Sequence, residues 1–316
     1  MIPMQAYDHE TGAPRAAIQL SEYAPPPWLA PELKLRFDLH PESTRVRAIA
    51  RFERNPAVSE QHPLVLSGES IQLIELALDG RVLAANEYSL DESAHTLTIA
   101  ADLPDSFELR IETEIAPAKN TALEGLYMSG GKFCTQCEAQ GFRRIVYFLD
   151  RPDVMSRYTT EVIGAKESFP ILLSNGNPIE RKDLGDGRHS VTWEDPFPKP
   201  TYLFALVAGD LGLVKDTFRT VSGRDVALEL YVDHGNEDRA GFAMQSLKDA
   251  MAWDERTFGL EYDLDIYMIV AVDDFNMGAM ENKGLNLFNS KLVLANPRTA
   301  TDDAFEFIQA VIGHEY

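Results

Sequence analysis

The chain has 316 residues, of which 45% are hydrophobic and 25% charged, so it is long enough to bury a large core and to fold as about two domains. Acidic residues number 50 against 29 basic ones, which leaves a net charge of −21. This charge repels nucleic acid and anionic membrane surfaces. We therefore expect no nucleic-acid partner and no membrane partner, and the composition excludes a disordered chain.

The N-terminus and the cysteines indicate the compartment. The first residues show no basic start followed by an apolar stretch, which is the pattern of a secretory signal. Cys134 and Cys137 are too few for a secreted disulfide scaffold and are compatible with a reducing cytosol. We expect a cytoplasmic, monomeric protein.

The first two thirds of the chain predict β structure. Residues 1–30, which include a run of three prolines, are expected to form an irregular arm. After it, short runs with alternating apolar residues are separated by turn signals such as 175–178, Asn-Gly-Asn-Pro. The expected strands lie at residues 33–39, 46–52, 64–66, 71–78, 96–99, 107–115, 162–163, 171–173, 191–193 and 202–207. We expect a mainly β domain over residues 1–210.

Residues 211–316 are predicted to be α+β. Strands are expected at 226–232, 266–272, 285–288 and 292–294, and a helix at 240–258 that Gly259 terminates. A last helix begins after Thr301, a good N-cap, and buries Ala304, Phe305 and Ile308. Its apolar pattern stops at Tyr316 without a terminating residue, so we expect the sequence to end inside a helix.

The last helix ends in His314-Glu315-Tyr316, which could begin a His-Glu-x-x-His motif. In that motif two histidines on one helix face bind zinc, and the glutamate activates the bound water. The second histidine is not in the chain. As a dipeptide, His-Glu is also typical of an ordinary helix end.

A second signal lies upstream of this helix. Residues 276–282 read Asn-Met-Gly-Ala-Met-Glu-Asn, and Gly-Ala-Met-Glu-Asn is the exopeptidase motif of the zinc aminopeptidase N family. Residues 120–127, Asn-Thr-Ala-Leu-Glu-Gly-Leu-Tyr, and 134–139, Cys-Thr-Gln-Cys-Glu-Ala, are similar to the N-terminal domain of bacterial members. The chain therefore resembles the front portion of this family from about residue 33 to residue 316.

The resemblance implies a fold. Residues 1–210 would form the family's N-terminal β domain of saddle-like antiparallel sheets. Residues 211–316 would form the first part of a thermolysin-like zinc peptidase domain, truncated within the zinc helix.

The resemblance also implies a substrate site. Glu138 and Glu281 would bind the terminal amine of a peptide with Gln136 assisting, the Gly278-Ala279 backbone would pair with the substrate main chain, and Met277 would line the pocket for the first side chain. The complete set of implied substrate-binding residues is Gln136, Glu138, Met277, Gly278, Ala279, Met280, Glu281 and Asn282.

The implied catalytic parts are one zinc ion per full-length enzyme, His314 as a ligand and Glu315 as the general base. The remaining ligands, a second histidine and a glutamate, and a tyrosine that stabilises the intermediate, would lie beyond Tyr316. We expect the full-length enzyme to remove neutral or basic first residues from peptides. The 316-residue chain alone is expected neither to hold zinc nor to be active.

Four alternatives compete with this interpretation. A truncated homologue could bind peptide N-termini without cleaving them, and related zinc enzymes with the same fold hydrolyse an epoxide lipid. Cys134 and Cys137 could form a redox dithiol, although packing residues beside Gln136 and Glu138 explain them better. The pair Asp273-Asp274 could bind a metal, but loop solvation explains it adequately.

Overall fold

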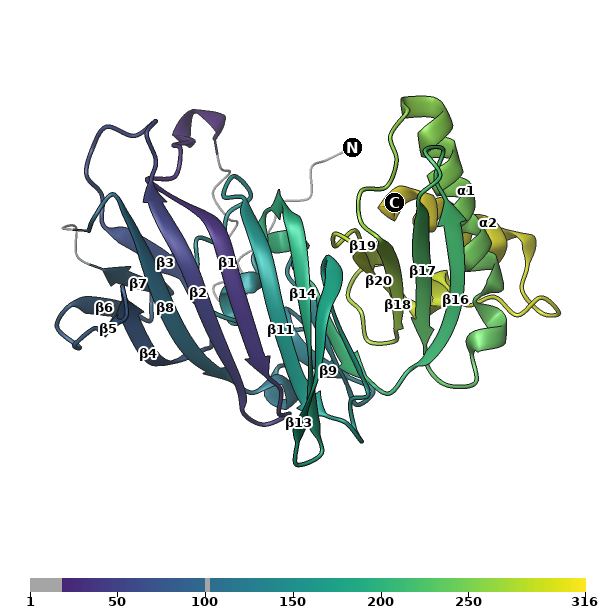
Figure 1. Cartoon of the computed structure of the whole chain (residues 1–316), viewed down its shortest axis with the longest axis horizontal. Coiled ribbons are helices and arrows are strands. Elements are labelled where there is room, and N and C mark those ends of the chain that lie inside the picture. The colour runs from purple at the N-terminus through teal and green to yellow at the C-terminus, as the bar shows by residue number, and fades with distance from the viewer. Residues whose placement is uncertain (1–18, 100–102) are drawn as a thin grey trace.

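The structure is a computed structural model that describes residues 19–99 and 103–316. Figure 1 shows two parts that follow one another along the chain. The first part contains three β-sheets and extends to Gly209, and the second contains one sheet and two α-helices and begins at Gly212. The fold is thus mainly β followed by an α+β region, which is the expected fold class.

The largest sheet has eight strands in the order β13-β14-β11-β1-β2-β8-β4-β5. The strands are β1 (Trp28–Asp38), β2 (Thr44–Arg54), β4 (Gln72–Leu78), β5 (Arg81–Val82), β8 (Ser106–Ile115), β11 (Ser156–Ala165), β13 (Asn177–Gly185) and β14 (Arg188–Lys199). The expected antiparallel arrangement is wrong at one point, because β1 runs parallel to β11. A parallel pair needs a long crossover, and here the chain forms other strands of the same sheet and strands of both smaller sheets before it returns.

The predicted arm is too long at its C-terminal end. Residues 1–18 of the arm lie outside the described residues, but β1 begins at Trp28, so residues 28–30 are strand. The Trp28 indole N–H donates to the carbonyl of His62 over 3.2 Å, and its ring packs at 5.3 Å from that of Phe107. This burial of a large aromatic side chain extends the strand beyond the alternating pattern.

Two smaller sheets complete the first part. One has the order β12-β15-β10-β9 and the other the order β3-β7-β6. Their strands are β3 (Leu64–Ser67), β6 (Tyr88–Asp91), β7 (Thr96–Ile99), β9 (Gly125–Ser129), β10 (Lys132–Gln136), β12 (Ile171–Ser174) and β15 (Leu206–Gly209). The strand predicted at 202–207 begins later, because the Thr201 hydroxyl donates to Asp150 over 2.6 Å and holds the 3₁₀ helix η4 (Thr201–Leu203).

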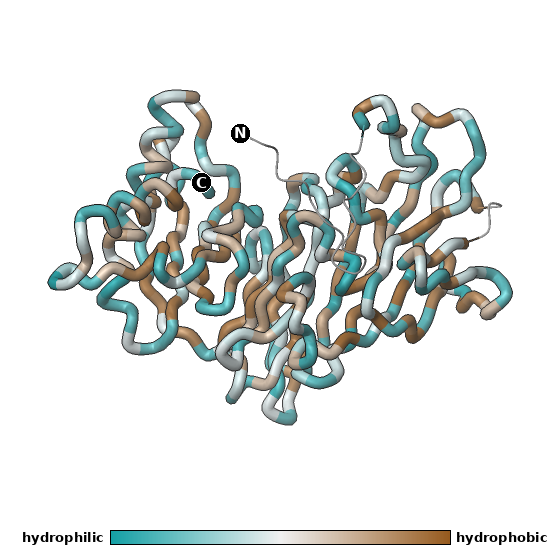
Figure 2. Tube along the Cα trace, turned by 180° about the vertical axis from the view of Figure 1, so that it is seen from behind, coloured by the Kyte–Doolittle hydropathy of each residue, from teal (hydrophilic) through white to brown (hydrophobic). Residues whose placement is uncertain are grey.

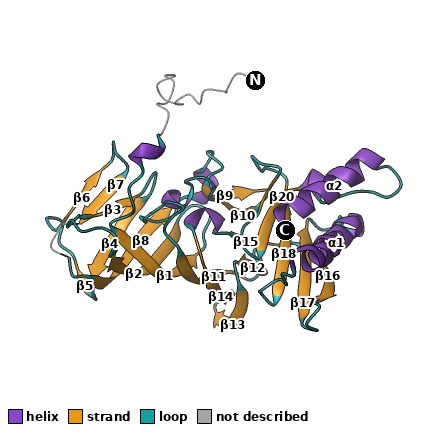
Figure 3. Cartoon of the chain, turned by 90° about the horizontal axis from the view of Figure 1, so that it is seen from above, coloured by secondary structure: helices purple, strands orange, loops and turns teal. Residues whose placement is uncertain are grey.

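The second part is a mixed sheet with the order β16-β17-β18-β20-β19. Its strands are β16 (Gly212–Arg219), β17 (Asp225–Val232), β18 (Ile266–Val272), β19 (Ala279–Met280) and β20 (Leu285–Asn289). The helices α1 (Gly241–Phe258) and α2 (Asp302–Glu315) pack together beside this sheet (Figure 3). Gly259 terminates α1 in the left-handed conformation, as predicted.

The strand predicted at 292–294 is wrong. The 3₁₀ helix η6 (Ser290–Leu292) occupies its start, and the side chain of Asn289 accepts a hydrogen bond from the Lys291 N–H. A local bond of this kind competes with strand pairing. The other 3₁₀ helices of the described residues are η1 (Leu20–Glu22), η2 (Pro117–Lys119), η3 (Phe142–Arg144) and η5 (Glu237–Arg239).

The main core joins the two parts. Apolar segments gather in the strands, whereas the peripheral loops are hydrophilic (Figure 2). The core of the first part continues without interruption into the second, through buried side chains that include Met268, Met280 and Leu287. A second core lies between the five-stranded sheet and the two α-helices. Among the helices of the described ranges, none has both the length and the apolar character required to span a bilayer.

The N-cap of α2 gives a first testable prediction. The Thr301 hydroxyl accepts a hydrogen bond from the Ala304 N–H over 3.3 Å, as the sequence predicts. Replacing Thr301 with alanine is expected to destabilise α2 by about 1 kcal/mol. Amide hydrogen exchange in the first turn of α2 should then be roughly fivefold faster. Thr299→Ala is the control, since Thr299 is exposed, and unchanged exchange in Thr301→Ala would contradict the assignment.

Candidate functional site

The segment 276–282 lies between the ends of two parallel strands. It follows β18 and leads into β20, and Ala279 and Met280 form the short strand β19. β19 is the edge of the five-stranded sheet and pairs with β20 on one side. Among the described strands, none pairs with its other side, so this backbone is open to an added strand.

The predicted residues of this segment differ in exposure. Met277 is 41% exposed and Gly278 is also exposed, whereas Asn282 is buried. The side chain of Met280 lies fully in the core, so only its backbone can meet a substrate. This corrects its predicted role as a substrate-binding side chain. Successive residues of a strand point to opposite faces, and the face that carries Met280 packs into the main core. Within the described part of the chain, neither polar side-chain atom of Asn282 has a hydrogen-bond partner.

The end of α2 carries the two residues of the His-Glu dipeptide beside this segment. α2 packs against β19, with His314 exposed and Glu315 half-buried. The pKa of Glu315 is raised to about 7, mainly by burial; the charges of Glu281 and Glu138 also raise it, while that of His314 lowers it. The structure therefore brings these four side chains into one electrostatic environment.

Gln136 and Glu138 come from the first part of the chain, at and just beyond the end of β10. Gln136 is 3% exposed, and its side-chain amide donates to the Glu138 carbonyl over 3.4 Å. Among the described atoms, the side-chain oxygen of Gln136 has no hydrogen-bond partner. Glu138 is half-buried. The predicted amine-binding residues thus converge from distant parts of the sequence.

The carboxylates at this site have no cationic partner. Within residues 19–99 and 103–316, none of Glu138, Glu281 and Glu315 forms a salt bridge to a lysine or an arginine. Glu281 and Glu315 line a cavity of about 220 Å³. Its other charged lining residues are Asp254, Glu261, Asp263 and Lys283. Because carboxylates predominate, this cavity favours a cationic group.

The residues present do not form a complete zinc site. His314 offers an imidazole at the exposed end of α2, but within the described residues no set of three histidine, cysteine or acidic side chains is placed to hold a metal. Structural and catalytic zinc sites need three or four protein ligands. The described part of the chain therefore supplies one candidate ligand, His314, and not a complete site.

The two cysteines are core residues. Cys134 is 1% and Cys137 0% exposed. Burial raises the pKa of the Cys134 thiol to about 12 and also raises that of Cys137. A redox dithiol needs an accessible thiolate with a lowered pKa. The geometry therefore favours packing, beside Gln136 and Glu138, over the redox alternative.

Asp274 is exposed, as loop solvation predicts, but it also forms hydrogen bonds to the first part of the chain. Its carboxylate accepts from the Ser129 hydroxyl over 3.0 Å, and its carbonyl accepts from the Tyr127 hydroxyl over 3.1 Å. These bonds join the loop before segment 276–282 to β9 in the first part. Sequence analysis also missed Tyr262, Tyr267 and Tyr316, whose rings pack together at the cavity, because no spacing signal connects them.

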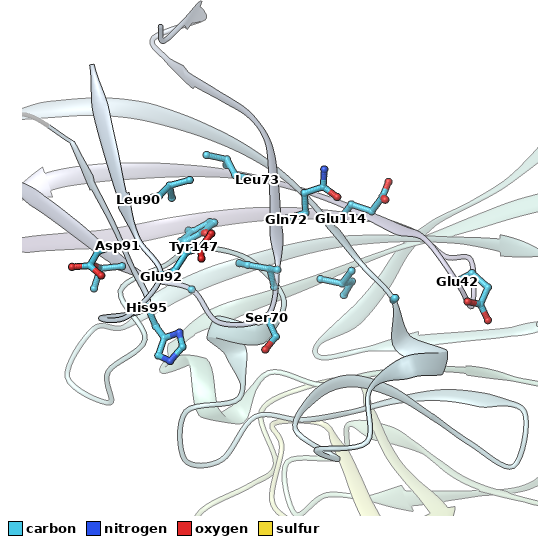
Figure 4. Close-up of a pocket in the computed structure, with 15 residues that line it drawn as sticks. Glu42, Ser70, Gln72, Leu73, Leu90, Asp91, Glu92, His95, Glu114 and Tyr147 are labelled. Carbon is cyan, nitrogen blue, oxygen red and sulfur yellow. The ribbon is translucent and has the colours of Figure 1, made fainter. Parts of the chain in front are cut away.

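A second cavity, of about 710 Å³, lies in the first part of the chain (Figure 4). Glu42, Asp91, Glu92 and Glu114 contribute carboxylates to its lining, with His95 and Tyr147. None of the predicted site residues lines it. We therefore place the candidate site at segment 276–282 and the end of α2.

Comparison with known proteins identifies the class. Residues 30–203 match the Peptidase M1 N-terminal domain, and residues 242–316 match the Peptidase family M1 domain. The chain belongs to peptidase family M1. This confirms the resemblance that the motifs indicate.

Several bacterial proteins share much of this sequence. The chain is 58% identical over 300 residues to Aminopeptidase N of Caulobacter vibrioides, covering 95% of this chain and 34% of that protein. It is 56% identical over 295 residues to Aminopeptidase N of Escherichia coli, covering 93% and 33%. A crystal structure of Legionella pneumophila aminopeptidase A with aspartic acid is 39% identical, with a TM-score of 0.90 and coverage of 94% of this chain and 35% of that one. The chain spans about a third of the length of the curated relatives that it matches.

Proposed function

We propose that the full-length protein is a zinc-dependent aminopeptidase that removes neutral or basic first residues from peptides. The observation that carries the proposal is the convergence of Glu138, Glu281 and Glu315, without a cationic partner in the described chain, at an open sheet edge. The similarity to aminopeptidases N supports it. We further propose a monomeric, cytoplasmic protein that acts in peptide catabolism, without a nucleic-acid or membrane partner.

Two carboxylates suit the recognition of a free terminal amine. A carboxylate about 4 Å from an ammonium group contributes roughly 4 kcal/mol at an effective dielectric constant near 20. Glu281 and Glu138 would provide this attraction, and the unpaired oxygen of Gln136 would accept one ammonium hydrogen. The amine of an acylated peptide lacks the charge. The site therefore favours an exopeptidase over an endopeptidase.

The open edge of β19 orients the main chain of the substrate. The backbone of Gly278 and Ala279 would bind an extended peptide as an additional strand. A peptide bound in this way would have its first peptide bond beside α2, because α2 packs against β19. Met277, which is exposed on the same loop, would contact the first side chain through its flexible thioether.

Glu315 and His314 would provide the chemistry in the full-length protein. We propose His314 as a zinc ligand, together with ligands from outside this chain. A zinc ion held there would supply a water molecule whose pKa is lowered to about 7. The carboxylate of Glu315 would hold the proton of the attacking water and release it to the leaving amine.

The test is to replace Glu281 with glutamine in the full-length, zinc-loaded protein. Loss of roughly 4 kcal/mol of amine attraction should lower kcat/KM for alanine p-nitroanilide about 10²- to 10³-fold. Glu306→Gln, at an exposed position of α2, is the control and should be unchanged. Equal hydrolysis of the N-acetylated substrate by the wild-type protein would contradict the proposal. If the protein binds peptides without cleaving them, and acetylation of the peptide N-terminus abolishes that binding, the non-catalytic alternative would be supported.

A further inference from the structure

One turn connects the two parts of the chain at the candidate site. The segment Asn175-Gly176-Asn177, here called the clamp turn, leads from β12 into β13. Asn175 is 3% exposed, and its amide nitrogen donates to the carbonyls of Leu203 at 3.0 Å and Lys283 at 2.9 Å. Its amide oxygen accepts from the Ala205 N–H at 2.7 Å. A single side chain thus joins the first part to the residue that follows Asn282.

Asn177 makes the second connection. Its side-chain oxygen accepts from the backbone N–H of Asp265 at 2.9 Å, and its nitrogen donates to the Asp265 carboxylate at 3.2 Å. Asp265 directly precedes β18. The clamp turn therefore holds both the start of the central strand β18 and the loop that leads into its neighbour β20.

Gly176 fixes the clamp turn against the first part. Its φ is +91°, a conformation that side-chain-bearing residues rarely adopt. A Cβ at this position would lie 2.1 Å from the Glu194 carbonyl oxygen on β14. The turn is therefore held closely against the eight-stranded sheet and transmits the position of that sheet to Asn175 and Asn177.

The clamp turn also belongs to the sheet that carries the first amine-binding residues. β12 ends at Ser174, immediately before the turn, and is connected through β15 to β10, which ends at Gln136. The other end of the connection, Lys283, is two residues beyond Glu281. One chain of hydrogen bonds thus runs from the sheet that carries Gln136 and Glu138 to the loop that carries Glu281.

We propose that the clamp turn is a positioning element that sets the separation between Glu138 and Glu281, and thereby the recognition of the substrate amine. This inference rests on the proposed function. Asn175 does not contact the amine itself. It acts through the Lys283 carbonyl, because a shift of the loop moves Glu281 away from Glu138, and misplacement of about 1 Å is costly at such a site.

The test is Asn175→Asp in the full-length, zinc-loaded protein, which removes the donor to Leu203 and Lys283 while preserving the shape of the side chain. We expect KM for alanine p-nitroanilide to rise about tenfold, with kcat changed less than about threefold. Inhibition by 1,10-phenanthroline, a chelator without an amine, should be unchanged. If Asn175 had only a structural role, the variant would not change KM for the amine substrate while leaving inhibition by 1,10-phenanthroline unchanged.

The chain offers a matched control. Asn55 is also buried, donates to the Pro26 carbonyl at 2.7 Å and accepts from the Ala57 N–H at 3.0 Å, but it lies far along the chain from the site. Asn55→Asp should leave KM unchanged. If Asn175→Asp does not fold, Asn177→Ala, at a half-buried position, should raise KM about threefold.

The outcomes separate the two proposals. Unchanged KM in a folded, active Asn175→Asp protein, or an equal rise in Asn55→Asp, would overturn the positioning role. If Asn175→Asp does not fold, unchanged KM in Asn177→Ala would do the same. Absence of any amine-dependent hydrolysis in the wild-type protein would instead overturn the proposed function.

Discussion

Replacing Glu315 with glutamine is expected to lower kcat of the full-length, zinc-loaded protein toward alanine p-nitroanilide by about 10²- to 10⁴-fold. Glutamine keeps the size of the side chain but cannot accept the proton of the attacking water. The position suits this role, because Glu315 is half-buried at the end of α2 and is close enough to Glu281 and Glu138 for their charges to affect it. Steady-state kinetics with saturating substrate measure the effect.

The same experiment distinguishes proton transfer from binding. KM should change much less than kcat, since the proposed amine-binding residues Glu138 and Glu281 are unaltered in this variant. Glu306→Gln on the same helix is the control for a changed charge on α2. If Glu315→Gln retained more than about a tenth of the wild-type kcat, a role as general base would be untenable. A zinc measurement on each variant checks that the metal is equally loaded.

Replacing Lys199 with methionine is expected to destabilise the first part of the chain by about 3–5 kcal/mol. Lys199 and Asp195 lie on β14, with side chains 3% and 0% exposed, and their Nζ and Oδ2 atoms are 3.0 Å apart. The ammonium group also lies 3.5 Å from the ring centroid of Tyr158. Removing it leaves the buried Asp195 carboxylate without this cation, with the Phe197 N–H as a donor to it at 3.3 Å. Amide hydrogen exchange of β11 and β14 in the full-length protein reports the loss.

A double variant tests whether the unpaired charge is the cause. Lys199→Met with Asp195→Leu should recover most of the loss, because an apolar pair of similar volume often replaces a buried ion pair without cost. Lys182→Met, which breaks a half-exposed pair with Glu180 on the adjacent β13, should leave β14 exchange unchanged. A single variant that exchanges like the wild-type protein would contradict the prediction.

The pH dependence gives a further readout of the same pair. Burial lowers the pKa of Lys199 from 10.5 to about 8. Between these values the unfolded chain binds more protons at this residue than the folded chain, so this contribution makes stability rise with pH. Lys199→Met should abolish that contribution. The comparison of wild type and variant between pH 8 and pH 10 isolates it from other titrating groups.

The elements that were predictable from sequence are those with local signals. Alternating apolar residues predicted β1, β2 and β8, and the caps Gly259 and Thr301 predicted the ends of α1 and α2. The predicted strands were wrong where a tertiary or side-chain contact outweighed the local alternating pattern. Trp28 extends β1, and Asn289 replaces a predicted strand with η6. Periodicity cannot reveal such contacts, because it reflects only which face of an element is buried.

The chemistry of the site followed from motifs, but its assembly did not. The strings at 134–139 and 276–282 and the His-Glu dipeptide predicted the residues by resemblance. They did not predict that β19 is an open sheet edge or that Met280 points into the core. They also gave no indication of the clamp turn, which the sequence shows only as an ordinary turn with glycine and asparagine.

The sequence by itself determined the family, the mainly β and then α+β order of elements, and the residues proposed to bind an amine and to move a proton. These properties reside in short strings and local periodicity. The tertiary structure alone decided that β19 is an open sheet edge beside α2 and that Asn175 links the first part of the chain to the loop that carries Glu281. The physical reason is that pairing between distant strands and the packing of a shared core bring such residues together, and neither is encoded in the spacing of neighbouring residues.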